Sequence, residues 1–331
     1  MRGDELSENK ISAELLAERV AWSLDRKIQE SWHRMEQFYN WCRVEGKTCS
    51  LSFSGGLDST VMLHLMRSNP FLKTAPIPVY FADTGIEYPE IREFVKSTPG
   101  VEWVRSDKKF KEIIDQYGYP IISKKTSYYL HELQQTKSAH MVKLRLTGWR
   151  KDGTHSPMGC ISKKWQFLVG APFKVSHRCC DFMKKRPMKC AGCPFIGVRA
   201  DEAKTRKDAY KLHGCNAYDQ KLARSWPLAF WTEKDIRDYL AMHSVPYSPI
   251  YDMGYTSTGC YTCAFGLHLE QWPNRFQLME KTHPRLWNQC MDFYGLQRIL
   301  EFMNEWLPKK QRISFRYSDY LDSKFSGGVF S

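Results

Sequence analysis

Residues 51–60 have the composition of a phosphate-binding loop. A Ser-Gly-Gly turn follows an apolar, strand-like run, and glycine lets backbone N–H groups approach a ligand closely. The helix-like run that follows would add its N-terminal amides and its dipole, both of which favour an anion. No lysine follows the glycines, so the pattern differs from the loop of Walker-type ATPases. The residues expected to bind phosphates are Ser54, Gly55, Gly56, Asp58 and Ser59.

A second loop, Asp83-Thr84-Gly85, follows the next strand-like run. An Asp and a Thr at a strand end can bind ribose hydroxyls or a nucleophile, although Asp-Thr-Gly is also ordinary turn chemistry. The loop comes one strand–helix unit after the phosphate loop. Because ligands bind at the carboxyl ends of parallel strands, we expect both loops to face one crevice.

Two arginines follow a later strand-like run, where a helix-like run from residue 200 begins. Guanidinium groups bind phosphate or sulfate through two parallel N–H donors, so Arg199 and Arg206 are candidates for the nucleotide site. Ion pairs with Glu202 at the helix start are the alternative use of these side chains. The spacing leaves both uses open.

The grouped cysteines indicate a metal or cluster site. Cys179 adjoins Cys180, Cys260 and Cys263 form a Cys-x-x-Cys turn, and thiolates select zinc or iron–sulfur clusters. One interpretation is a tetrahedral zinc site, with the ligands Cys190, Cys193, Cys260 and Cys263. The other is a [4Fe–4S] cluster bound by Cys180 or Cys179, by the Cys-x-x-Cys turn and by a fourth thiol. The cysteines expected to be isolated are Cys42, Cys49, Cys160 and Cys215.

Composition and charge indicate a folded cytoplasmic protein. The 331 residues are 42% hydrophobic and 14% aromatic, which argues against disorder. We expect no membrane segment, because there is no long uncharged apolar run and no signal-peptide layout at the N-terminus. In the cytoplasm the eleven cysteines would stay reduced. Of the net charge of +13, much comes from residues 142–189, which hold twelve basic residues against two acidic ones. This segment could bind a nucleic acid or be a solvated basic face.

Strand-like and helix-like runs alternate along much of the chain, which predicts a parallel α/β sheet. Apolar positions at helical spacing in 11–45 predict one or two amphipathic helices. The predicted strands are 48–53, 77–81, 101–105 and 194–199, and the predicted helices are 59–66, 88–96, 109–117 and a final one capped by Thr232. The predicted regions are N-terminal helices at 1–45, a nucleotide-binding domain at 46–250 with a basic insertion or lid at 118–190, and a cysteine-containing helical region at 251–331.

Four motifs occur in a characteristic order: Phe53-Ser54-Gly55-Gly56-Leu57-Asp58-Ser59, Asp83-Thr84-Gly85, Arg178-Cys179-Cys180-Asp181-Phe182 and Thr258-Gly259-Cys260-Tyr261-Thr262-Cys263. In this combination the chain resembles the phosphoadenosine phosphosulfate (PAPS) reductase family, from about residue 20 to about residue 305. It is similar to an iron–sulfur-bearing bacterial and phage branch, related to DNA phosphorothioation sulfurtransferases. In that branch the Cys-x-x-Cys is followed by Phe265-Gly266-Leu267-His268 and later by Cys290.

The resemblance implies a Rossmann-like, adenine nucleotide alpha-hydrolase-like (PP-loop) fold. It implies that residues 54–59 bind the phosphates of ATP, PAPS or adenosine phosphosulfate (APS), with Asp58 and Asp83 as candidate catalytic residues. Mg²⁺ would offset the pyrophosphate charge. The resemblance also favours iron–sulfur over zinc. In cluster-bearing APS reductases the four ligands correspond to Cys179, Cys180, Cys260 and Cys263, whereas in related sulfur-transfer members the fourth thiol corresponds to Cys290.

One departure from the family concerns the nucleophile. Assimilatory reductases attack the sulfate with a cysteine in a Glu-Cys-Gly-Leu-His setting, whereas residues 266–270 have no thiol there and no cysteine follows Cys290. We therefore expect cleavage of an adenine nucleotide at its α-phosphate, coupled to sulfur transfer or nucleic-acid modification, with a sulfur donor or thiol reductant as partner. The alternatives are a PAPS or APS reductase that uses a partner's thiol, and a non-catalytic nucleotide- or nucleic-acid-binding module with a structural cluster or zinc.

Overall fold

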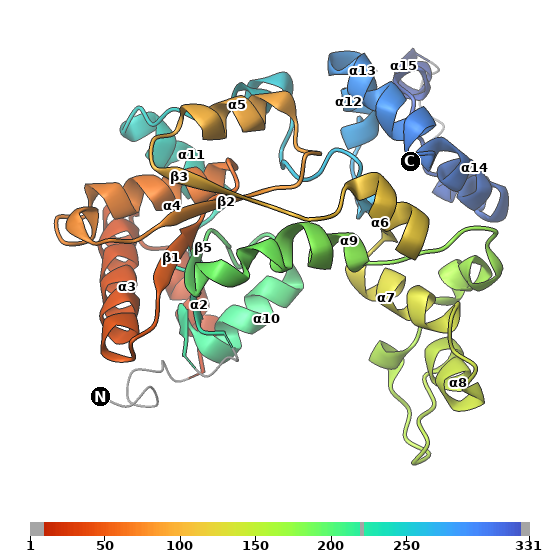
Figure 1. Cartoon of the computed structure of the whole chain (residues 1–331), viewed down its shortest axis with the longest axis horizontal. Helices are drawn as coiled ribbons and strands as arrows, with labels where there is room; N and C mark the ends of the chain where they lie inside the picture. The colour runs from red at the N-terminus through yellow and green to blue at the C-terminus, as the bar shows by residue number, and fades with distance from the viewer. Residues whose placement is uncertain (1–9, 219–221, 326–331) are drawn as a thin grey trace. The chain divides into compact units, whose positions relative to one another are not determined.

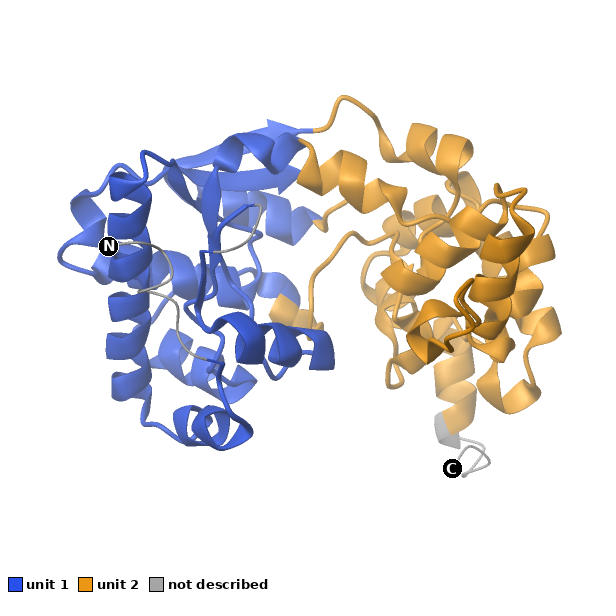
Figure 2. Cartoon of the chain, turned by 90° about the horizontal axis from the view of Figure 1, so that it is seen from below, with its two compact units in different colours: residues 1–83, 89–105, 187–250 blue, residues 84–88, 106–186, 251–331 orange. Residues whose placement is uncertain are grey.

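The computed structural model describes residues 10–218 and 222–325, which fold into two compact units (Figure 2). Unit 1 consists of residues 1–83, 89–105 and 187–250, and unit 2 of residues 84–88, 106–186 and 251–331. The regions predicted from the sequence are consecutive, whereas these units are built from interleaved segments. Most of the predicted insertion at 118–190 belongs to unit 2, together with the C-terminal helices.

Unit 1 is built on a six-stranded sheet in the order β3-β2-β1-β5-β7-β6. All neighbouring strands are parallel except the edge pair β6 and β7. Leu51 in β1 lies opposite Val79 on one side and Phe195 on the other, and all three side chains are buried. The strands are β1 (Cys49–Ser52), β2 (Val79–Asp83), β3 (Val101–Arg105), β5 (Cys193–Ile196), β6 (Asn216–Ala217) and β7 (Arg224–Ser225). The predicted parallel α/β sheet is confirmed.

The helices of unit 1 lie beside this sheet (Figure 1). They are α2 (Ala13–Val20), α3 (Leu24–Val44), α4 (Leu57–Ser68), α5 (Pro89–Ser97), α10 (Lys204–His213) and α11 (Glu233–Met242). The predicted Thr232 cap is confirmed, since its hydroxyl accepts from the Asp235 N–H and the Asp235 carboxylate accepts from the Thr232 N–H. The run from residue 200 becomes helical only at Lys204, because the Arg199 N–H donates to Glu202 in a preceding turn.

Unit 2 is mainly helical. Its helices are α6 (Phe110–Tyr117), α7 (Lys124–Leu133), α8 (Ala139–Thr147), α9 (Arg178–Cys180), α12 (Arg275–Thr282), α13 (Pro284–Asn288), α14 (Leu296–Trp306) and α15 (Tyr317–Phe325). Two short parallel strands, β4 (Ile121–Ile122) and β8 (Ala264–Phe265), join the insertion to the segment after the Cys-x-x-Cys turn. In neither unit does a helix of the described residues have the length and apolar character needed to cross a membrane.

A buried ion pair joins two helices of unit 1. Lys27 in α3 is 1% exposed, and its Nζ donates to Asp235 Oδ2 at 2.6 Å and to the Val20 carbonyl at 2.7 Å. Asp235 also accepts from the Thr232 N–H at 2.7 Å. A buried ammonium that loses its carboxylate keeps an uncompensated charge. This pair therefore links the N-terminal helices to the cap of α11.

We expect Asp235→Asn to lower the free energy of unfolding by roughly 3–5 kcal/mol, because it leaves Lys27 buried without a counter-charge. Asp238→Asn is the matched control, since Asp238 pairs with Lys234 on the same helix but both side chains are exposed. The control substitution should lower the free energy of unfolding by only ~0–1 kcal/mol. Urea denaturation of both variants measures the difference, and equal losses would contradict this role of the pair.

The same pair should make stability depend on acidic pH. Burial raises the pKa of Asp235, but hydrogen bonds from Lys27 and Thr232 outweigh it, so the net pKa lies below its ordinary value. A carboxylate with a lowered pKa in the folded state contributes stability above its unfolded pKa of about 3.9, and this contribution is lost as pH falls. The stability gap between wild type and Asp235→Asn should therefore shrink below about pH 4. Denaturation curves between neutral and acidic pH test this, and a constant gap would refute it.

Candidate functional site

The phosphate loop of unit 1 is closed by hydrogen bonds onto the first turn of α4. Gly56 is the N-cap of α4 and contributes no side-chain cap. The Ser59 hydroxyl lies 2.9 Å from the Gly56 carbonyl, to which it donates, and accepts from the Ser54 N–H at 3.2 Å. Ser59 is 4% exposed. The structure thus brings together the serines and glycines predicted to bind phosphate, at the N-terminus of a twelve-residue helix.

Two glycines allow the close packing of this loop. Gly55 has φ +73°, and a Cβ there would lie 2.9 Å from Val95 Cγ2. A Cβ at Gly197, just after β5, would lie 2.9 Å from the Ser59 nitrogen, which is backbone that cannot easily move. The role of Gly197 was not predicted from the sequence. A glycine directly after a predicted buried strand could have indicated it, because that position is typical of a close backbone approach.

Arg199 connects the end of β5 to the phosphate loop. Its Nε donates to Asp58 Oδ1 at 2.9 Å and its Nη1 to Asp201 at 2.7 Å. Burial raises the pKa of Asp58, while Arg199 acts in the opposite direction. Arg206 forms an ion pair with Glu202, which is the alternative use considered from the sequence. Of the two arginines, the structure therefore brings Arg199 directly against a loop residue.

Asp83 lies at the carboxyl end of β2 and is 5% exposed. Arg92 binds it in an ion pair, and the Arg105 Nε donates to Asp83 Oδ2 at 2.7 Å. The chain passes from unit 1 to unit 2 directly after Asp83. Thr84 and Gly85, which the sequence grouped with Asp83, thus belong to unit 2.

Five cysteines from separate segments of the chain come together in unit 2, and we call them the thiol group: Cys179, Cys180, Cys260, Cys263 and Cys290. The first pair occupies α9 and leads into a π-helical turn at Asp181–Lys185. The second pair forms a tight turn in which the Cys263 N–H donates to the Cys260 carbonyl at 3.0 Å. Cys290 lies in another π-helical turn, at Gln289–Phe293. Such turns are frequent at functional sites.

The thiols of this group influence one another electrostatically. A hydrogen bond between Cys179 and Cys180 raises the pKa of Cys179 and lowers that of Cys180. Cys260 and Cys263 also act on Cys179. Burial raises the pKa of Cys290, and the charge of the Cys263 thiolate raises it further. The five thiols therefore lie close enough to act on one another, Cys290 through Cys263.

Polar residues surround the thiol group, and one of them, Thr84, was predicted from the sequence to lie in the nucleotide site instead. The Thr84 hydroxyl lies 3.7 Å from Cys260 Sγ and hydrogen-bonds Glu87, which is 9% exposed. The Cys260 thiolate, followed by Glu87, raises the pKa of Lys184. The Arg275 Nη1 donates to the Cys263 carbonyl at 3.2 Å. Among the residues here that were not predicted for any site, Lys184 had a sequence signal, because it follows Cys180 by one helical turn.

The donors of the thiol group are thiols, which are ligands of zinc and of iron–sulfur clusters. A tetrahedral zinc ion would need four sulfurs at ~2.3 Å from one centre. In the part of the chain that the structure describes, no three His, Cys, Asp or Glu side chains are gathered tightly enough to hold a metal ion. A cluster spreads its thiolates over several irons. The thiols that surround one another in unit 2, with Lys184 close to Cys260, suit that larger anionic group.

The other Cys-x-x-Cys pair lies in unit 1. Cys193 starts β5 opposite Cys49 in β1, and its thiol contacts that of Cys42. All three side chains are buried. Cys190 is exposed, and its thiol donates to the Pro187 carbonyl at 3.3 Å. The structure thus places Cys193 among thiols that the sequence analysis expected to be isolated.

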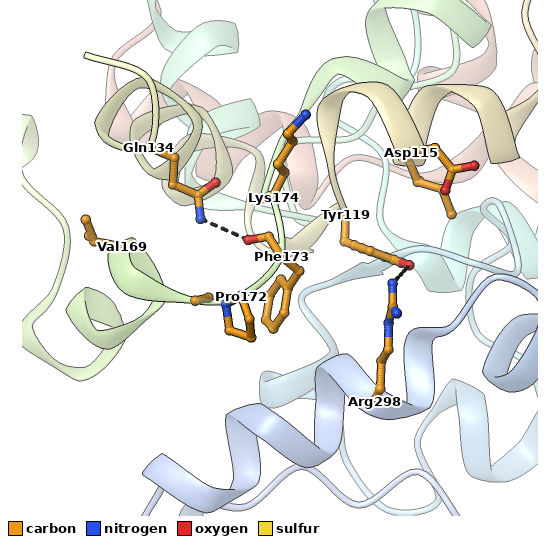
Figure 3. A pocket seen from close by; sticks show the side chains of 10 residues that line it. Asp115, Tyr119, Gln134, Val169, Pro172, Phe173, Lys174 and Arg298 are labelled. Atoms are coloured by element: carbon orange, nitrogen blue, oxygen red, sulfur yellow. Dashed lines mark hydrogen bonds between the residues drawn. The ribbon is translucent and has the colours of Figure 1, made fainter. Parts of the chain in front are cut away.

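A separate cavity of about 540 Å³ lies in unit 2 (Figure 3). The Gln134 amide stabilises one wall, since it donates to the Leu168 and Phe173 carbonyls at 3.1 Å and accepts from the Val175 N–H at 2.9 Å. On another side Arg298 donates to the Tyr119 hydroxyl at 3.2 Å. The lining shares no residue with the thiol group.

Gly55→Ala tests the packing of the phosphate loop. We expect it to destabilise unit 1 more than Gly46→Ala does, because a Cβ at Gly46 would meet nothing within 4 Å although its φ is also positive, at +61°. In each variant the left-handed conformation of the new alanine lowers the free energy of unfolding by ~1–2 kcal/mol. Only in Gly55→Ala does the new Cβ also clash with side chains of α5. Chemical denaturation measures both losses, and equal values would show that the loop tolerates a side chain at residue 55.

The phosphoadenosine phosphosulfate reductase domain matches residues 48–156 and, in an overlapping alignment, residues 108–265. An adenosine 5′-phosphosulfate reductase from Salinibacter ruber is 35% identical over 91 residues, which cover 26% of this chain and 35% of that protein. The enzyme of the same name from Bacillus mycoides is 26% identical over 215 residues, covering 63% of this chain and 70% of that protein. The chain thus spans about a third of the Salinibacter relative's length.

A crystal structure of PAPS reductase from Candida auris in a phosphate complex is similar over 77% of this chain and 97% of that chain, with 15% identity and a TM-score of 0.39. A score this low carries no inference about activity. The domain match extends from the strand before the phosphate loop to the residues just after the Cys-x-x-Cys turn, which is more than half of the chain. The chain therefore belongs to the phosphoadenosine phosphosulfate reductase domain family.

Proposed function

We propose that this protein transfers the adenylyl group of ATP to an oxygen of an acceptor, with release of pyrophosphate, and that sulfide then displaces AMP, so that sulfur replaces this oxygen without a change of oxidation state. The nucleotide would bind at the phosphate loop of unit 1, and a [4Fe–4S] cluster would bind at the thiol group of unit 2. The observation that supports this proposal best is the gathering, within one unit, of five cysteines from separate segments of the chain.

In this proposal the phosphate loop binds the nucleotide through Ser54, Gly55, Gly56 and Ser59, at the N-terminus of α4. Mg²⁺ would offset the charge of the departing pyrophosphate. We assign Asp58 and Asp83 to positioning, because each carboxylate is already paired with guanidinium groups. Asp58 would hold Arg199 beside the loop, where its remaining donors could bind phosphate oxygens.

Cys180, Cys260 and Cys263 would be three of the cluster ligands, with Cys179 or Cys290 as the fourth. When bound by four thiols, such a cluster would order its surroundings, whereas a cluster bound by only Cys180, Cys260 and Cys263 would leave one iron open to sulfide. Around it, Lys184 would offset negative charge, and Thr84 would orient Cys260 through the contact between its hydroxyl and the sulfur. Glu87 would hold the Thr84 hydroxyl in place.

A second candidate is reduction of APS or PAPS, which the names of the Salinibacter and Bacillus relatives support. A thiol must accept the sulfonyl group in that reaction. Residues 266–270 of this chain carry no thiol, so the acceptor would be a member of the thiol group or a partner protein. Sulfite is then the product, which distinguishes the two candidates.

Anaerobic product analysis tests the proposal. Cluster-loaded protein should convert ATP to AMP and pyrophosphate when sulfide and an acceptor are present, and Gly55→Ala should lower this activity by disturbing the phosphate loop. Release of sulfite from APS or PAPS with a thiol reductant, without pyrophosphate from ATP, would favour the reductase instead. No turnover of any of the three nucleotides would contradict both enzymatic functions.

Metal analysis tests the ligand set. We expect about four irons and four acid-labile sulfides per chain in the parent protein, and loss of most iron in Cys260→Ala. Whichever of Cys179→Ala and Cys290→Ala also loses iron identifies the fourth ligand. Cys215→Ala is the control, because Cys215 is equally buried but lies in unit 1. Zinc in place of iron would contradict the cluster.

A further inference from the structure

We propose that residues 137–164, which we call the basic arm, bind a single-stranded nucleic acid, with Trp149 stacking on an unpaired base. The binding itself does not depend on catalysis. Only the further step, in which the bound nucleic acid is the sulfur acceptor, rests on the proposed function.

The middle of the basic arm is exposed, whereas its ends pack against the rest of unit 2 through Arg145 and Ile161. Helix α8 has no buried residue. The loop after it folds back on itself, because the Arg150 N–H donates to the Thr154 carbonyl at 2.9 Å and the Ser156 N–H donates to the Gly148 carbonyl at 2.8 Å. Figure 1 shows this loop running out from α8 and returning. Residues 149–155 are all exposed.

The charge of the basic arm is largely uncompensated. Its single acidic residue, Asp152, accepts from the N–H and hydroxyl of Thr154 at 2.9 and 2.6 Å and so closes its own turn. Arg145 pairs with Glu132 in α7 at 2.5 Å. The other six cations form no ion pair with a carboxylate within the described residues, and they are Lys137, Lys143, Arg150, Lys151, Lys163 and Lys164. Such a density of cations attracts a polyanion.

An exposed aromatic ring lies among these cations. Trp149 is 44% exposed, and its ring centroid lies 4.9 Å from that of His155 across the loop. The His155 Nε2 contacts the Thr147 carbonyl at 3.0 Å, which holds the imidazole in place. The loop therefore presents an indole on a supported hairpin, directly before Arg150 and Lys151.

This combination favours a single-stranded nucleic acid over other polyanions. Proteins bind single strands by pairing cations with the phosphates and stacking aromatic side chains on the bases. A duplex hides its base faces and would leave Trp149 without a partner. Every base has a π-face, so this arrangement predicts tight binding with little sequence preference.

Fluorescence anisotropy of wild type and variants tests the inference without requiring turnover. The probes are fluorescein-labelled oligouridylate and oligodeoxythymidylate of about 20 nucleotides, a length that exceeds a typical binding site, and a duplex of the same length. Trp149→Ala should weaken single-strand binding about tenfold, because stacking on one base is lost, with an unchanged salt slope. The double variant Arg150→Ala/Lys151→Ala should make the salt slope shallower by about 1.4, since about 0.7 is lost for each phosphate contact.

The matched control is Lys309→Ala/Lys310→Ala, which removes the same charge from an exposed turn elsewhere in unit 2. It should change affinity much less than the arm variants. Equal losses in both double variants would overturn the inference, because net charge alone would then explain binding. Tighter binding of the duplex, unaffected by Trp149→Ala, would also overturn it. If binding follows the expected pattern while ATP gives no product, the arm's role stands and the proposed function fails.

Discussion

A contact between two pieces of backbone shapes the phosphate loop. Gly197, at the end of β5, approaches the first turn of α4 so closely that a Cβ would lie 2.9 Å from the Ser59 nitrogen. Because β5 lies beside β1 in the sheet, this approach sets where the chain turns after β1. Two residues later Arg199 reaches Asp58, so the same contact brings a guanidinium to the loop. A larger residue at 197 would separate the parts of the site.

The second constraint is the point at which the chain leaves β2. Asp83 is held by two arginines in unit 1, and the next residues belong to unit 2. There Thr84 contacts Cys260, and the Tyr261 N–H donates to the Ile86 carbonyl at 2.9 Å. One short segment therefore leads from the carboxyl end of β2 to hydrogen bonds with the Cys-x-x-Cys turn.

Sequence patterns over a few residues predicted those elements that depend only on neighbouring residues. The strand at 101–105 and the Thr232 cap were predicted correctly, since alternation and capping act over a few residues. The start of α10 was placed too early, because the turn between Arg199 and Glu202 depends on a specific hydrogen bond. Gly197 was missed because Ser59, which it approaches, is brought near only by folding, and Glu87 was missed because its link to Lys184 in the thiol group likewise depends on folding. The interleaving of the two units likewise has no local signal.

Transfer of labelled sulfur tests the central claim most directly. Anaerobically prepared protein would be loaded with iron and ³⁵S-sulfide and mixed with ATP and a single-stranded nucleic acid. We expect label in the nucleic acid, AMP in equal amount, and loss of both products without ATP or in Cys260→Ala. AMP formed while the label stays on the protein would contradict sulfur transfer. Label that reaches the nucleic acid equally well without ATP would contradict the coupling of the two sites.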